Sequence, residues 1–175
     1  MTQILTPDET RDTVLARVRG AGASWFLLLD AAHDERIWPK LYHSNVRYQC
    51  LYDGQLADQY ASVAPYLAQI DTDNPSLLHW YLENGWGEAW GYLLSSQALF
   101  EQIRRHLRRF LMVKNEAGDE VYFRFYDPRV LRVFLASCDA GERAHFYGPI
   151  ESFVLENAEG KLVRLQADDH GLESA

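Results

Sequence analysis

The sequence has little of what marks secreted, membrane-spanning or disulfide-stapled proteins. Its 175 residues include 2 cysteines, Cys50 and Cys138, which lie far apart and form no CxxC pair. This spacing predicts two buried, reduced thiols. The longest apolar run, Trp25–Leu29, is too short to cross a bilayer. The N-terminus lacks the basic and apolar regions of a signal peptide. We therefore expect a cytoplasmic protein without membrane insertion.

The chain is acidic and has no excess of positive charge: its formal net charge is −8 at pH 7. Binding to nucleic acid through bulk electrostatics is therefore not expected. Apolar side chains are abundant: 47% of residues are hydrophobic and 13% are aromatic, enough to fill the core of one domain. We expect an α/β domain at residues 1–137, a small C-terminal extension packed on it at 138–167, and a disordered tail at 168–175.

Hydrophobic periodicity predicts alternating strands and helices up to about residue 110 and antiparallel pieces after it. The fold class is therefore α/β (α+β), a mixed sheet with flanking helices and antiparallel hairpins toward the C-terminus. Helices are expected at 6–19, 34–41, 73–85, about 97–110 and 130–135. Strands are expected at 24–32, 48–52, 66–70, 90–96, 111–114, 121–126, 151–157 and 161–166.

Cap residues mark the expected helix starts. Thr6 is expected to cap the first helix, Asn74 the third, and Ser95 or Ser96 the fourth, because Ser, Thr and Asn accept hydrogen bonds from the first free N–H groups. The fourth helix carries apolar residues at helical spacing, namely Leu99, Ile103, Leu107 and Phe110.

Acidic residues stand at the ends of several expected strands. Asp30, Asp53, Asp71 and Asp127 occupy these positions, and carboxylates that converge at a sheet edge can hold Mg²⁺ for phosphoryl transfer. The alternative is that they start turns and cap helices. We prefer the alternative, because no DxDx[TV] nucleophile pattern follows Asp30. The histidines show no zinc-binding spacing, so no metal and no cofactor is expected.

Two other segments are candidate partner-binding surfaces. "GWGEAWG" (85–91) leads into a strand and not into the helix that a phosphate loop requires, so Trp86 and Trp90 either pack a tight turn or form an exposed aromatic anchor. "RRHLRR" (104–109) places four arginines opposite the apolar stripe, where they form a solvated face or bind an acidic protein. These are Arg104, Arg105, Arg108 and Arg109.

The segment "YFRFYDPRVLRVFL" (122–135) combines apolar residues with charges. In a strand to residue 126, Tyr122, Arg124 and Tyr126 would share one face, making the two tyrosines further partner-binding candidates. Asp127 would cap the helix that Pro128 opens, and Arg129 in its first turn would need a compensating acid. The segment contains no identifiable nucleophile or general base. We interpret Arg124, Asp127 and Arg129 as a charged joint between strand and helix.

These residues resemble the effector chaperones, or adaptors, of bacterial type VI secretion systems, a family whose domain was long catalogued as of unknown function. The resemblance rests on "FRFYDPRVLRVFL" (123–135), "APYLAQI" (64–70), "WGEAWGYLLSS" (86–96) and "LLLDAA" (27–32), and covers residues 24–135. Its signature positions are Phe123, Arg124, Asp127, Pro128 and Arg129.

The resemblance implies a cytoplasmic, non-enzymatic adaptor. Such a protein binds a secreted toxin effector and helps load it onto the spike protein of the secretion machine. The effector itself is not identified by the sequence. The alternative function, taken from the residues alone, is a metal-dependent phosphohydrolase that uses Asp30, Asp53 and Asp127.

Overall fold

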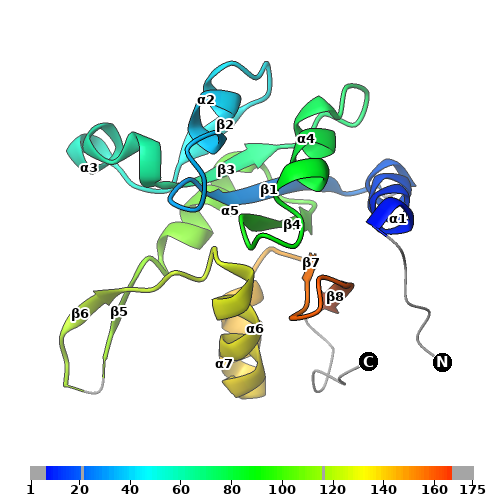
Figure 1. The fold of residues 1–175 in the computed structure, drawn as a ribbon. Coiled ribbons are helices and arrows are strands. Elements are labelled where there is room, and N and C mark those ends of the chain that lie inside the picture. Colours follow the sequence, from blue (N-terminus) through cyan, green and yellow to red (C-terminus); the bar gives the residue numbers. More distant parts are fainter. Residues whose placement is uncertain (1–6, 21, 116, 167–175) are drawn as a thin grey trace.

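A computed structural model describes residues 7–20, 22–115 and 117–166. Its centre is a six-stranded sheet in the order β2-β3-β1-β4-β7-β8, in which every neighbouring pair is antiparallel. The strands are β1 (Ser24–Asp30), β2 (Tyr48–Cys50), β3 (Pro65–Gln69), β4 (Gly91–Ser96), β7 (Ser152–Glu156) and β8 (Leu162–Gln166). A separate hairpin of β5 (Met112–Lys114) and β6 (Glu120–Tyr122) projects from the body (Figure 1).

Helices cover both faces of this sheet, and each face has its own core. On one face lie α1 (Pro7–Gly20), α2 (Ile37–Tyr42) and α4 (Ser76–Asn84). On the other lie α5 (Phe100–Arg108), α6 (Pro128–Ser137) and α7 (Ala140–Tyr147). Side chains of β1 alternate between the two cores: Leu27 and Leu29 join the first, and Phe26 and Leu28 the second. The predicted α/β architecture with flanking helices is confirmed.

The predicted strand at 24–32 is confirmed in place and burial, since all residues of β1 after Ser24 are buried. The closing hairpin is also confirmed as β7 and β8. Because β7 pairs with β4, the extension at 138–167 continues the main sheet.

Two helices were not predicted from the sequence, α3 (Gly54–Gln59) and α7. The start of α7 could have been predicted from the sequence, because Asp139 and Glu142 have the spacing of a capping box and form one in the structure.

Three local predictions are wrong. β6 ends at Tyr122 and not at residue 126, because the chain turns where the Asp127 N–H donates to the Arg124 carbonyl at 3.0 Å. Leu99 does not face the core, since it precedes α5 and is 73% exposed. Neither serine caps α5. The Ser96 hydroxyl accepts from the N–H of Ala98, which precedes the first residue of the helix.

Two further cap predictions have different outcomes. Asn74 does not cap α4, because that helix begins at Ser76 with Pro75 in the cap position. The carboxylate of Asp71 accepts the Asn74 N–H at 3.2 Å instead, which makes this segment a turn before the helix. The predicted cap Thr6 and the predicted tail at 168–175 lie outside the described residues.

Candidate functional site

One edge of the sheet gathers most of the polar residues. Since neighbouring strands are antiparallel, β1, β2 and β7 run in the same direction and end at the same edge. Asp30 ends β1, Asp53 follows β2, and Glu156 ends β7. Asp71 follows β3 and therefore lies at the opposite edge. The four strand-end acids predicted from sequence thus do not converge at one point.

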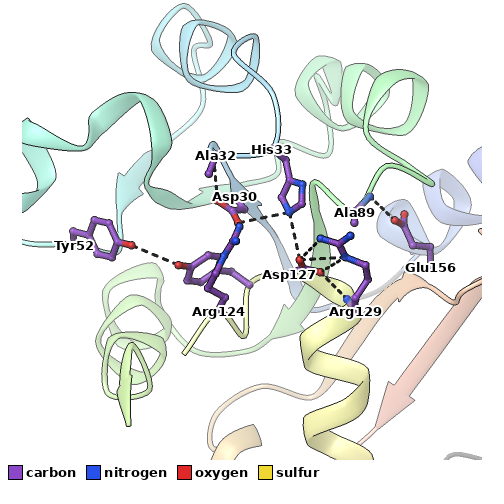
Figure 2. A network of polar contacts seen from close by, with 10 residues as sticks. Asp30, Ala32, His33, Tyr52, Ala89, Arg124, Asp127, Arg129 and Glu156 are labelled. Carbon is purple, nitrogen blue, oxygen red and sulfur yellow. Dashed lines mark hydrogen bonds and ion pairs between the residues drawn. The ribbon is translucent and has the colours of Figure 1, made fainter. Parts of the chain in front are cut away.

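Asp30 is a buried carboxylate held from two sides. Its side chain is 1% exposed, and an ion pair joins its Oδ2 to Nη2 of Arg124. The Ala32 N–H donates to Oδ1 at 3.1 Å, so the same carboxylate also fixes the turn after β1. The charge of a buried carboxylate needs such partners. Arg124 therefore connects the segment before α6 to the end of the central strand (Figure 2).

Asp127 is the second buried carboxylate, and it has both roles predicted for it. It caps α6 by accepting the Arg129 N–H at 2.8 Å. It also accepts Nε of Arg129 at 3.0 Å and Nη2 at 2.6 Å. Burial raises the pKa of Asp127, but the hydrogen bonds from Arg129 outweigh this and leave the pKa below its ordinary value. The predicted compensation of Arg129 is confirmed.

His33 connects these two acids, and sequence reasoning missed it. Its Nε2 lies 3.7 Å from Oδ2 of Asp30 and 3.4 Å from Oδ2 of Asp127. The predicted joint must be corrected, because Arg124 pairs with Asp30 and not with Asp127. The site is a continuous chain of polar side chains, which we call the charged joint (Figure 2). Its members in order are Arg124, Asp30, His33, Asp127 and Arg129.

The joint has few features of a metal site. Within the described ranges, no group of three His, Cys, Asp or Glu residues could hold a metal ion. Arg124 and Arg129 occupy oxygens of the two buried carboxylates, so a divalent metal would have to displace a guanidinium. Asp53, the third acid of the phosphohydrolase alternative, binds arginines of α5 instead.

The predicted basic face of α5 divides into two pairs of arginines. Arg104 and Arg108 are half-buried and turn toward the end of β2. There they donate to the Cys50 and Leu51 carbonyls, each at 2.9 Å, and to Asp53 at 3.2 and 2.6 Å. The hydrogen bond from Arg104 holds the pKa of Asp53 below its ordinary value. The other two, Arg105 and Arg109, are exposed.

Of the two alternatives given for residues 85–91, the packed turn is confirmed and the exposed aromatic anchor is not. Trp90 is 3% exposed, so its prediction as an exposed contact is wrong. Trp86 is half-buried, and its Nε1 donates to the Gly160 carbonyl at 3.0 Å. Glu156 accepts the N–H group of Gly87 at 2.6 Å. It also accepts that of Ala89 at 2.8 Å (Figure 2). Burial raises the pKa of Glu156 above its ordinary value.

Beside the charged joint lies an apolar groove of about 280 Å³. Its lining comes from α3, from the short helix η1 (Ala61–Val63), from the end of β2 and from the hairpin. The five lining residues, called the tyrosine groove below, are Tyr52, Leu56, Tyr60, Val63 and Tyr122. Four of them are more than 40% exposed. Only Tyr122 among these was predicted as a partner-binding candidate.

Tyr126 connects the groove to the joint, although it is too deeply buried, at 4% exposed, to bind a partner as predicted. Its hydroxyl lies 3.5 Å from that of Tyr52. Burial raises the pKa of Tyr126, and the nearby positive charge of Arg124 opposes this rise. Arg124 does not line the groove, but it follows the lining residue Tyr122 by two residues and lies near Tyr126, whose hydroxyl reaches Tyr52 of the lining.

Exposed apolar surface such as the tyrosine groove is often a site of interaction. A family profile described as a domain of unknown function (DUF4123) matches residues 25–145. The chain belongs to this family, which is associated with type VI secretion effector adaptors. Searches of curated proteins and of solved structures each gave no significant match. None of the helices in the described ranges is long and apolar enough to span a membrane.

Proposed function

We propose that this protein is a non-enzymatic cytoplasmic adaptor that binds a type VI secretion effector and helps load it onto the spike protein. The observation that carries the proposal is the family match over residues 25–145. The matched range contains the charged joint and the tyrosine groove. Exposed Tyr and Arg side chains are the types that dominate binding interfaces, and here they lie beside the charged joint.

The test is co-expression with the products of the neighbouring genes. The adaptor carries an affinity tag, and the untagged partners are the adjacent toxin and the spike protein of the same locus. We expect a soluble complex that survives gel filtration, and an effector that is less soluble when the adaptor is left out. An adaptor that retains neither partner would refute the proposed function.

A further inference from the structure

The tyrosine groove has no occupant within the described part of the chain, although it exposes large side chains. Leu56 is 43% exposed, Tyr60 42% and Val63 46%, and all three stand on one wall formed by α3 and η1. Tyr122, 53% exposed, stands on the opposite wall. Contiguous exposed apolar surface of this kind marks sites of interaction.

The wall made by the hairpin is built to present Tyr122. Residues directly opposite in an antiparallel pair share a face, and Met112 pairs with Tyr122 while Val113 pairs with Val121. Met112 and Tyr122 therefore share one face of the ribbon, and Val113 and Val121 the other. The Tyr122 ring lies 5.8 Å from the ring of Tyr52, so the two tyrosines of the lining contact each other.

A positive charge next to the groove indicates what binds there. Arg124 is 49% exposed, and one N–H of its Nη2 holds the buried Asp30. Its other N–H groups make no hydrogen bond to the described residues. A guanidinium fixed from behind by a buried acid keeps its outer donors ready for a second carboxylate, because no side-chain ordering is needed on binding.

We propose that the tyrosine groove receives an apolar segment of the effector that carries an Asp or Glu side chain, whose carboxylate pairs with Arg124. This inference rests on the proposed function and adds the chemistry of the partner. The apolar side chains of the segment pack between Leu56, Tyr60 and Tyr122. Its carboxylate meets Arg124 where the groove reaches the charged joint.

Other occupants fit the groove less well. A second copy of this chain would bring a net charge of −8 to a chain of the same charge, and the two would repel each other. A drug-sized ligand fits pockets of about 300–1,000 Å³ that bury most of its surface. The groove is smaller, at about 280 Å³, and its lining is largely exposed.

The first experiment measures Kd for the full-length product of the adjacent toxin gene immobilised on a biosensor. Leu56→Glu with Tyr60→Glu places two charges in the groove, and we expect binding at least about tenfold weaker. The matched control is Leu99→Glu with Val133→Glu, because these side chains are 73% and 72% exposed and line no part of the groove. We expect this control to bind like the parent protein.

The second experiment tests the acidic partner side chain. Arg124→Gln is expected to weaken binding and to flatten the dependence of Kd on NaCl, because the ion pair is lost. Arg124→Lys keeps the charge and should retain that salt dependence. A photoreactive benzoylphenylalanine at position 60 should crosslink to an effector peptide that contains apolar residues and an Asp or Glu. Thermal melts of every variant confirm folding.

The outcomes separate the two proposals. If the parent protein binds neither the effector nor the spike protein, the proposed function and this inference both fail. If the parent binds and the groove variant binds equally well, only the inference fails. Crosslinking of position 60 to a second copy of the chain, or to a peptide without a carboxylate, would also overturn it.

Discussion

Asp127 shows how one carboxylate can support two structures. It caps α6 through the Arg129 N–H and neutralises the guanidinium of the same residue. A positive charge in the first turn of a helix is unfavourable by about 0.3–1 kcal/mol, and the cap acid cancels it within two residues. Asp127 therefore holds the start of α6 together with the Arg124–Asp30 pair.

Substitutions at Asp127 should separate these two contributions. Asp127→Ala removes the cap and is expected to lower the free energy of unfolding by about 1–2 kcal/mol. Asp127→Asn can still accept the backbone N–H, so it should lose only the smaller ion-pair contribution. Chemical denaturation of the three proteins measures the difference. Equal stabilities for all three would show that Asp127 is neither cap nor charge partner.

The lowered pKa of Asp127 also predicts a dependence on pH. A carboxyl group whose pKa is lower in the folded state stabilises the fold above its unfolded pKa of about 3.9. This stabilisation is lost as pH falls through the folded pKa. The parent protein should therefore lose more stability than Asp127→Asn between about pH 5 and pH 2. Parallel melts across this range measure the loss, and identical slopes would contradict the assignment.

The residue-level predictions succeeded where the partners are close in sequence. Asp127, Pro128 and Arg129 are adjacent, so cap chemistry alone fixed their arrangement. The partner of Arg124 lies 94 residues away, and no local rule could choose Asp30 over Asp127. His33 was missed because Asp127 is also far from it in sequence. Only the folded chain brings Asp30 and Asp127 together on either side of the His33 imidazole.

Among the elements, α5 uses its cations in two ways. Arg104 and Arg108 anchor the helix to the end of β2, where carbonyls left without strand partners accept their hydrogen bonds. Arg105 and Arg109 remain exposed. The predicted basic binding face therefore reduces to these two residues, and the inner pair holds the fold together.

A double charge reversal tests the outer pair. Arg105→Glu with Arg109→Glu should weaken the complex with the effector without changing the melting temperature, since neither side chain is buried. Arg104→Glu with Arg108→Glu is the contrasting variant, and it should lower the melting temperature because Asp53 loses its partners. Co-purification and a circular-dichroism melt measure both effects. A complex fully retained by the outer double variant would remove α5 from the interface.

Prediction at the level of elements depended on periodicity and caps. The strands β1 and β4 and the hairpin of β7 and β8 were found because apolar runs and turn residues mark them. The helix α3 contains no buried residue, so it has no apolar stripe for sequence reasoning to detect. That same exposure is what makes it a wall of the tyrosine groove.

For the molecule as a whole, the metal-dependent phosphohydrolase remains a testable alternative. Thermal melting with and without millimolar Mg²⁺ or Mn²⁺ distinguishes the two functions, because a ligand bound only to the native state raises stability. We expect no shift in melting temperature. A rise that disappears in Asp30→Ala would instead favour the enzyme.

The fold class could be predicted from sequence, but the order of strands could not. Alternating helices and strands implied helices on a sheet, whereas the insertion of β7 beside β4 depends on contacts between residues about 60 apart. The placement of Asp30, Asp53 and Glu156 along one edge follows from that order. Sequence reasoning placed acids at strand ends without knowing which ends would meet.

The position of β7 also has a consequence for synthesis on the ribosome. While the chain emerges, β4 has β1 on one side and nothing on the other until residues 152–156 leave the exit tunnel. A nascent chain that already contains the whole family-matched range of 25–145 still displays an open strand edge, which invites pairing with other chains. Premature stop codons between residue 145 and the start of β7 should therefore yield insoluble fragments and not shorter adaptors.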